Sequence, residues 1–264
     1  MNYFEQLAAR SRAVGSLVCV GLDPDAKRTP ISEVAARNRA IIEATAPYAA
    51  CYKPNLAFYE QFGIEGWRAL EATLAAIPGD IPVIADGKRG DIGSTAEAYA
   101  RALFETWGVH AATLNPYMGR DTVEPYLAYK GRGLYLLCRT SNPGAADFQY
   151  LQVDGVPLYE QVARTVTSWS PDIGLVVGAT APDELRRIRE IVPGASLLVP
   201  GVGAQGGSPA EVIAAAGAEP GTLVVNASRS IYYASDGADF PEAAARAAQA
   251  LRDELAGAAA SIHA

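Results

Sequence analysis

The sequence has few of the residues that form disulfides or bind metals. Its 264 residues include three cysteines and two histidines. Cys19, Cys51 and Cys138 are odd in number and lie in or next to strand-like apolar runs, which suits small buried side chains better than disulfides or metal ligands. His110 and His263 are too few and too far apart for a metal site. We therefore expect neither a disulfide framework nor a bound metal.

The sequence also lacks an excess of basic charge and any segment of membrane-spanning length. The formal net charge is −7, whereas a nucleic-acid surface needs a concentration of Lys and Arg. No apolar run approaches the roughly 20 residues of a membrane span. The first residues, MNYFEQL, have neither the basic region nor the long apolar region of a signal peptide. These features predict a soluble cytoplasmic protein that binds neither nucleic acid nor a membrane.

Strand-like and helix-like segments alternate along the whole chain. Apolar runs predict strands at 17–22, 49–52, 81–85, 111–114, 133–137, 173–177, 196–199 and 222–225. Helix-like stretches lie at 32–46, 66–76, 95–107, 158–169, 182–191, 209–215 and 241–255, several opened by Pro, Ser or Thr. Eight units of a strand followed by a helix close most simply into a (β/α)8 or TIM barrel. The length of the chain suits one domain over residues 1–264. A doubly wound open sheet is the alternative.

Polar residues follow nearly every expected strand. In chain order these are Asp23, Lys53, Asp86, Lys88, Asn115, Arg139, Thr180, Gln205, Asn226 and Arg229. In a barrel such strand ends converge on one mouth, where active sites are built, whereas in an open sheet they spread along an edge. Asp23 and Asn115 also suit turns, Thr180 suits a helix cap, and the role of Arg139 stays open. The distribution favours the barrel.

The densest charge cluster, DGKRGDI at residues 86–92, follows the third expected strand. Because side chains alternate between the faces of a strand, Asp86 and Lys88 should point the same way. Asp91 lies beyond Gly90, where the chain can turn sharply without a Cβ penalty. Its carboxylate can therefore face a neighbour instead.

A glycine-rich segment, VPGVGAQGG at residues 199–207, follows the seventh expected strand. It contains the G-x-G-x-x-G spacing of dinucleotide-binding folds, but it lies in the seventh unit and the next strand ends in Asn226, not in an acid that would bind a ribose diol. A phosphate loop is the better interpretation, with backbone N–H groups, Gln205, Ser228 and Arg229 as donors. Simple turns with Arg229 as a surface charge are the alternative.

Motifs along nearly the whole chain resemble the orotidine 5′-monophosphate decarboxylase family. The family signature D-x-K-x-x-D-I followed by Thr is matched by Asp86, Lys88, Asp91, Ile92 and Thr95. The supporting matches are Gly-Leu-Asp23, Tyr-Lys53, Thr140-Ser141-Asn-Pro-Gly-Ala, the segment from Pro200 through Gln205 to Gly207, and Ser228-Arg229-Ser-Ile-Tyr. The Arg-Gly pair inside the signature is similar to one bacterial branch. The chain departs from some members by having Ser228 where they have Gly.

The resemblance implies a cofactor-free decarboxylation of orotidine 5′-monophosphate to uridine 5′-monophosphate (UMP), the last step of pyrimidine nucleotide synthesis (EC 4.1.1.23). It implies catalytic roles for Lys53, Asp86, Lys88 and Asp91, with Lys88 stabilising and then protonating the C6 carbanion. The substrate-binding residues it implies are Asp23 and Lys53 at the ribose, Ser141 at the pyrimidine, and Ile92, Thr95, Pro200, Gln205, Ser228 and Arg229. It also implies a homodimer in which Asp91, Ile92 and Thr95 act in the site of the other subunit.

Other functions stay open at this point. Related barrels use the same D-x-K-x-x-D framework with a divalent ion as decarboxylases or aldolases of sugar phosphates. They need an acidic ligand after the second strand, where this chain has Lys53. An idle phosphate-binding barrel and a nicotinamide-binding protein are alternatives of a different class. Lys88 between two carboxylates argues against the first, and the missing ribose-binding acid argues against the second.

Overall fold

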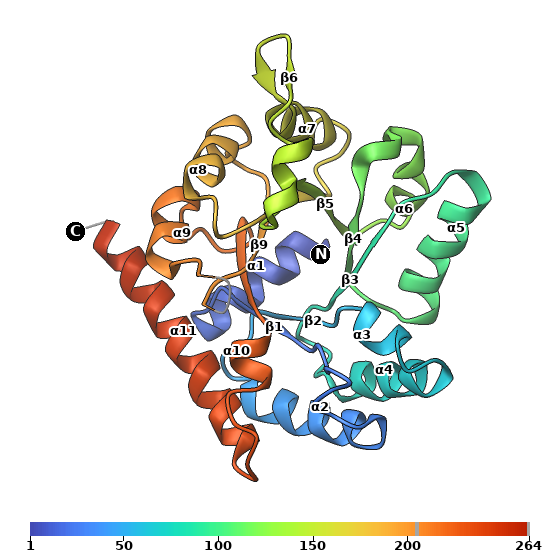
Figure 1. Ribbon diagram of the computed structural model, residues 1–264, viewed down its shortest axis with the longest axis vertical. Helices are drawn as coiled ribbons and strands as arrows, with labels where there is room; N and C mark the ends of the chain where they lie inside the picture. The colour runs from blue at the N-terminus through green and yellow to red at the C-terminus, as the bar shows by residue number, and fades with distance from the viewer. Residues whose placement is uncertain (204–205, 263–264) are drawn as a thin grey trace.

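Eight parallel strands form the centre of the molecule, and helices form an outer ring around them (Figure 1). The computed structural model describes residues 1–203 and 206–262. The central strands are β1 (Val18–Gly21), β2 (Cys51–Lys53), β3 (Ile84–Arg89), β4 (Ala111–Leu114), β5 (Gly133–Arg139), β8 (Ile173–Val177), β9 (Leu197–Pro200) and β10 (Leu223–Ala227). Neighbouring strands pair in the order β2-β1-β10-β9-β8-β5-β4-β3. All eight expected strands are therefore present.

The two ends of this sheet meet, so the sheet is a closed barrel. The amide of Tyr52 donates to the carbonyl of Pro82 at 3.0 Å, and the amide of Asp86 donates to the carbonyl of Pro54 at 3.0 Å. These bonds join β2 to the segment that contains β3. An open sheet would leave both edges unpaired. The (β/α)8 barrel is thus confirmed, and the doubly wound sheet is wrong.

The expected helices are present, with some changes at their ends. The α-helices are α1 (Tyr3–Val14), α2 (Ile31–Thr45), α3 (Ala57–Glu60), α4 (Ile64–Ala76), α5 (Gly93–Arg101), α6 (Glu124–Leu127), α7 (Leu158–Thr167), α8 (Pro182–Ile191), α9 (Pro209–Ala216), α10 (Arg229–Tyr232) and α11 (Phe240–Ile262). The expected helix at 95–107 has two parts, α5 and a π-helical turn η1 (Ala102–Thr106). Short 3₁₀ turns occur at η2 (Pro116–Met118), η3 (Arg120–Thr122) and η4 (Pro143–Asp147). No described helix is long and apolar enough to cross a bilayer.

Helix α1, which the sequence analysis did not predict, closes the amino-terminal end of the barrel. A capping box starts it, because the side chain of Asn2 accepts from the amide of Glu5 and the side chain of Glu5 accepts from the amide of Asn2. Tyr3 and Leu7 pack on the inward-facing residues of the strands, including Tyr135. A Cβ on Gly133 would lie 2.2 Å from the ring of Tyr3, so glycine is needed there. This end of the barrel is therefore covered by α1.

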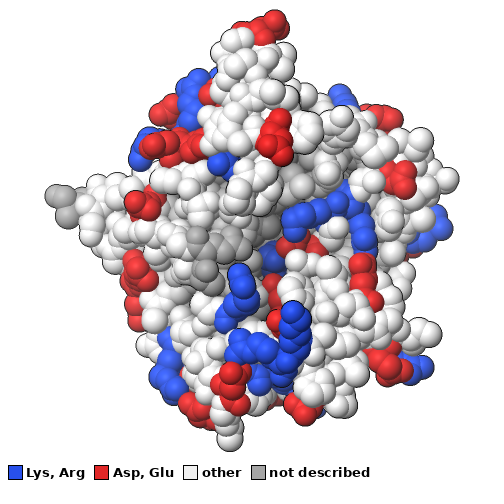
Figure 2. All heavy atoms as spheres, in the orientation of Figure 1, with Lys and Arg blue, Asp and Glu red and all other residues white. Residues whose placement is uncertain are grey.

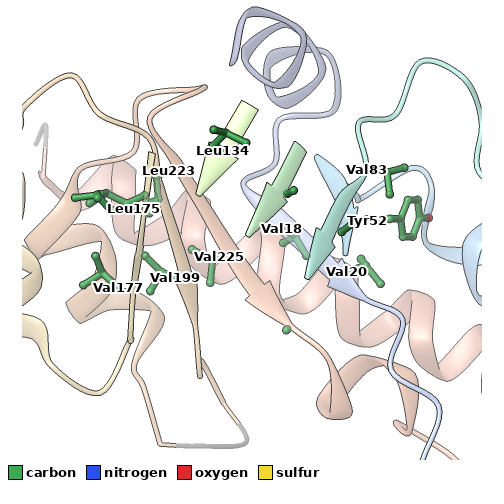
Figure 3. Packing of buried hydrophobic residues seen from close by; sticks show 14 of the residues in the cluster. Val18, Val20, Tyr52, Val83, Leu134, Leu175, Val177, Val199, Leu223 and Val225 are labelled. Carbon is green, nitrogen blue, oxygen red and sulfur yellow. The ribbon is translucent and has the colours of Figure 1, made fainter. Parts of the chain in front are cut away.

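Most strand residues are buried on both faces of the sheet. Val18 and Val20 belong to the cluster between the strands and the helices, whereas Cys19 lies in the barrel interior. Figure 3 shows members of the outer cluster, among them Val177, Val199 and Val225, projecting from their strands. Burial on both faces explains why the strands appear in the sequence as short continuous apolar runs. Cys19, Cys51 and Cys138 are buried free thiols, as predicted.

The connection from β5 to α7 contains a hairpin that the sequence analysis also missed. Strands β6 (Gln152–Val153) and β7 (Val156–Pro157) pair antiparallel and project from the barrel (Figure 1). The turn between them has positive φ at Asp154, 53°, and at Gly155, 76°. Asp-Gly is the sequence favoured for such a turn, so the dipeptide was a usable signal.

Candidate active site

A cavity of about 350 Å³ lies where the carboxyl ends of the strands converge. Figure 2 shows the mouth of the barrel as a hollow with basic side chains around its rim. Predicted site residues that line the cavity are Asp23, Lys53, Asp86, Lys88, Pro200, Ser228 and Arg229. They come from the ends of β1, β2, β3, β9 and β10. The predicted convergence of polar strand ends is confirmed for these residues.

Asp86 is the centre of a charged array in this cavity. Its Oδ2 lies 2.8 Å from Lys53 Nζ, and its Oδ1 lies 2.6 Å from Lys88 Nζ. Thr113 Oγ1 donates to the same Oδ1 at 2.9 Å and accepts from the backbone N–H of Lys88 at 2.9 Å. The carboxylate thus receives three donors from β2, β3 and β4. Thr113 is a site residue that the sequence analysis missed.

The array consists of ionised groups. Burial raises the pKa of the Asp86 carboxyl, but the two ammonium groups outweigh burial, and the pKa lies well below its ordinary value. Burial lowers the pKa of the Lys53 ammonium, but the charges of Asp86 and Asp23 raise it above its ordinary value. Lys53 and Asp86 therefore form a buried ion pair at neutral pH. The Lys88 side chain is 43% exposed, so its ammonium can reach a bound molecule.

The backbone between Asp86 and Lys88 is not a regular strand. The sequence predicts that both side chains point to the same face because side chains alternate along a regular strand. Strand β3 instead shifts its pairing with β4 between Ala85 and Arg89, and Lys88 has a φ of 46°. A positive φ is uncommon outside glycine and costs energy, and such conformations cluster at functional sites. The predicted contact between Asp86 and Lys88 is present, but it arises from an irregular backbone and not from regular strand alternation.

Asp23 lines the cavity next to this array. Its Oδ1 accepts from the amide of Asn55 at 3.0 Å, and its Oδ2 accepts from Ser228 Oγ at 2.6 Å. The local turn is instead held by Asp25, which accepts from the amide of Lys27. Asp23 is therefore a cavity residue and not the turn residue of the alternative interpretation. Asn55 was missed by the sequence analysis.

The glycine-rich loop after β9 folds back on itself. The amide of Gly203 donates to Gly207, that of Gly206 to Gly203, and that of Gly207 to Gly201. These three donors are engaged inside the loop, so an anion would have to meet other donors, such as the guanidinium of Arg229. Gln205 lies outside the described residues. The closed barrel also excludes the dinucleotide fold, and Asn226 is engaged by donating to the carbonyl of Cys19 at 3.0 Å.

Four predicted residues, Asp91, Ile92, Thr95 and Ser141, are not among the described residues that line the cavity. Asp91 Oδ1 accepts from the amide of Ile92 at 2.8 Å, and the Ile92 side chain is 57% exposed. Thr95 is exposed in the first turn of α5. Ser141 follows β5 and packs on Gly178, where a Cβ would lie 2.9 Å from the Cβ of Ser141. Among the residues that the structure describes, the three exposed or partly exposed signature residues are thus outside the cavity lining that contains Lys88.

Two of the remaining polar strand ends, Asn115 and Arg139, make hydrogen bonds within the described chain. Asn115 makes the expected Asx turn by accepting from the amide of Tyr117 at 3.0 Å. Arg139 donates to Tyr150 Oη at 2.9 Å. Thr180 is not a helix cap, because Ala181 occupies the cap position of α8 without a side-chain bond. Within residues 1–203 and 206–262, no three His, Cys, Asp or Glu side chains gather in a way that could hold a metal ion.

A closed (β/α)8 barrel with a buried ion-pair array at the carboxyl ends of its strands is the architecture of a TIM-barrel enzyme. Residues 16–248 match the model of the Orotidine 5′-phosphate decarboxylase / HUMPS family. The chain belongs to this family.

Similar proteins extend over nearly the whole chain. An orotidine 5′-phosphate decarboxylase of Herpetosiphon aurantiacus is 48% identical over 259 residues, which cover 94% of this chain and 96% of the relative. One of Dehalococcoides mccartyi is 45% identical and covers 97% of both chains. The solved structure of Leishmania donovani OMP decarboxylase has a TM-score of 0.84 at 39% identity, covering 96% of this chain and 99% of that one. The predicted family is therefore confirmed.

Proposed function

We propose that the chain converts orotidine 5′-monophosphate to UMP and CO₂, with Lys88 as the group that stabilises and protonates the pyrimidine carbon C6. The observation that carries the proposal is the array of Lys53, Asp86 and Lys88 at the barrel mouth. Its accessible ammonium, that of Lys88, suits a substrate that carries a carboxylate. The near full-length decarboxylase relatives support the same activity.

The chemistry requires a cation beside C6. When the bond between C6 and the carboxylate breaks, the electron pair stays on C6 and CO₂ leaves. The ammonium of Lys88 would stabilise this charge and then donate its proton to form the C6–H bond. Solvent would return a proton to the amine. Asp86 holds Lys88 Nζ in a fixed position, and Lys53 keeps Asp86 ionised, so the cation needs little reorganisation during the reaction.

The rest of the cavity would bind the nucleotide. Asp23 and Lys53, which line the cavity, would accept from and donate to the ribose hydroxyls, and Arg229 would bind the phosphate from the start of α10. Ser141 would contact the pyrimidine, and Pro200 would line the cavity beside the phosphate. The phosphate group of the substrate is remote from the carbon that reacts, so the energy of binding the phosphate can be used to organise the site.

We also propose the homodimer in which Asp91, Ile92 and Thr95 complete the site of the other subunit. The large exposed apolar side chains of Ile92, Tyr117 and Met118 lie in the segments that follow the neighbouring strands β3 and β4. Exposed apolar side chains gathered in one region mark an interaction surface more often than scattered ones do. This arrangement would bring the Asp91 carboxylate of one subunit to the Lys88 ammonium of the other.

The test is decarboxylation of orotidine 5′-monophosphate by purified protein in excess chelator. We expect rapid conversion by the wild type and a loss on the order of a thousandfold in kcat for Lys88→Ala. Lys130→Ala is the matched control, because Lys130 is exposed and donates only to the carbonyl of Leu127. The alternative of a metal-dependent decarboxylase or aldolase would show no conversion in chelator, and would act on a sugar-phosphate keto acid once a divalent ion is added.

A further inference from the structure

We propose that Ser228 is a positioning residue that orients the carboxylate of Asp23 toward the ribose diol and connects it to the phosphate-binding Arg229. This inference rests on the proposed function, because it concerns the ribose and phosphate ends of the same cavity. Ser228 lines the cavity together with Asp23 and Arg229.

The hydrogen bonds of Asp23 leave specific positions free for a ligand. Ser228 Oγ donates to Oδ2 at 2.6 Å, and the amide of Asn55 donates to Oδ1 at 3.0 Å. Each carboxylate oxygen can accept about two hydrogen bonds. Counting the hydrogen bonds within residues 1–203 and 206–262, each oxygen keeps one acceptor position beside the cavity that Asp23 lines. Two adjacent acceptors match the two hydroxyls of a ribose diol.

Ser228 is itself held from two sides. Its carbonyl accepts from the amides of Ile231 at 3.0 Å and Tyr232 at 2.8 Å, which fixes it at the start of α10. On the other side, a Cβ on Gly21 would lie 2.6 Å from the Cβ of Ser228, so the end of β1 approaches closely only because residue 21 is glycine. Arg229 is the next residue along the chain. The held position of Ser228 therefore fixes its hydroxyl at Asp23 and, one residue further, the start of the Arg229 side chain.

Asp23 and the catalytic array share the cavity but have separate hydrogen-bond partners. Both Asp23 and Lys53 line the cavity. Lys53 Nζ lies 2.8 Å from Asp86 Oδ2, whereas Ser228 Oγ donates to Asp23 Oδ2 at 2.6 Å. The charge of Asp23 also helps to raise the pKa of the Lys53 ammonium. The Ser228 hydroxyl thus gives the proposed ribose-binding acid a partner of its own, outside the pair of Lys53 with Asp86.

The experiment is a double-mutant cycle of Ser228→Ala and Asp23→Ala, read by the affinity for UMP in calorimetry and by KM and kcat for orotidine 5′-monophosphate. Ser228→Ala should raise the Kd and KM about tenfold with a smaller change in kcat, because it removes a hydrogen bond to a charged group. In the Asp23→Ala background, removal of the same hydroxyl should have little further effect. Ser235→Ala is the matched control, since Ser235 Oγ donates to Asp239 Oδ1 at the same 2.6 Å outside the cavity.

Binding of 2′,3′-dideoxyuridine 5′-monophosphate provides a second reading. This ligand has no diol, so Ser228→Ala should weaken its binding far less than that of UMP. Any of three results overturns the inference. The free-energy effects of Ser228→Ala and Asp23→Ala on UMP binding could be additive, or Ser228→Ala could leave the Kd and KM unchanged. Ser228→Ala could also weaken the binding of the two ligands by the same factor. A wild-type protein that binds UMP but does not decarboxylate the substrate would overturn the proposed function and leave this binding test intact.

Discussion

Asp86 is the residue on which the other charges of the site depend. It is 7% exposed and pairs with Lys53, which is 3% exposed, and with the accessible Lys88. Removing one partner of a buried pair leaves the other charge uncompensated, which costs more than the pair itself contributes. The same carboxylate therefore matters for stability and for the position of the proposed catalytic lysine.

We expect Asp86→Asn to lower the free energy of unfolding by about 3 kcal/mol, because Lys53 would remain buried without its counter-ion. Urea denaturation followed by circular dichroism measures this change. The matched control is Asp80→Asn, which removes a partner of Arg10 at the surface, where Asp80 is 68% exposed. Loss of such a pair should cost no more than about 1 kcal/mol. Equal effects of the two substitutions would contradict the role given to Asp86.

The pKa shifts of Asp86 and Lys53 predict how the stability that their ion pair contributes depends on pH. The folded-state pKa of Asp86 is depressed, so its stabilisation is present above the unfolded pKa and is lost as the pH falls through the acid range. The folded-state pKa of Lys53 is raised, so its stabilisation is lost only as the pH rises through the alkaline range. The stability difference between wild type and Asp86→Asn should stay constant from about pH 5 to 9 and shrink below about pH 4. A difference that changes near pH 7 would contradict these directions.

At the scale of elements, the strands were predictable because each is buried on both faces and therefore forms a continuous apolar run. Contacts between strands were not predictable in the same way. Thr113 lies inside the apolar run of β4, and only the pairing of β3 with β4 shows that its hydroxyl reaches Asp86. Helix α1 was missed because a barrel unit begins with a strand, and nothing in the barrel repeat requires a helix before β1. The residues outside the described part, such as Gln205, keep their predicted role as a hypothesis.

The role of α1 as the closure of the barrel leads to a prediction that separates stability from activity. Tyr3→Ala should lower the free energy of unfolding by about 3 kcal/mol, because the ring is fully packed against the barrel interior. The kcat and KM of the folded protein should change little, since α1 lies at the end opposite the cavity. Thermal melts and steady-state kinetics on the same samples measure both quantities. Ile64→Ala, at a side chain that is 71% exposed, is the control and should leave the melt nearly unchanged.

At the scale of the whole molecule, one chain supplies a closed barrel and a lined cavity, while part of its signature lies outside that lining. Asp86 and Lys88 meet in the cavity, whereas Asp91, Ile92 and Thr95 of the same signature lie outside its lining. In a dimer, Asp91, Ile92 and Thr95 of one subunit can lie at the cavity of the other subunit, so that all residues of the signature contribute to one site. A two-fold symmetric dimer forms two such sites with one kind of contact.

Mixing two inactive variants tests this arrangement directly. In a dimer of Lys88→Ala with Asp91→Ala, one site carries both substitutions and the other carries neither. Random exchange of equal amounts makes half of the dimers mixed, so about one quarter of wild-type activity should return. A mixture of Lys88→Ala with Asp86→Asn is the control, because both residues belong to the same chain's array and every mixed site stays damaged. Recovery in the first mixture alone would establish shared sites, whereas no recovery in either, with exchange of subunits verified by mass, would place Asp91 in the site of its own chain.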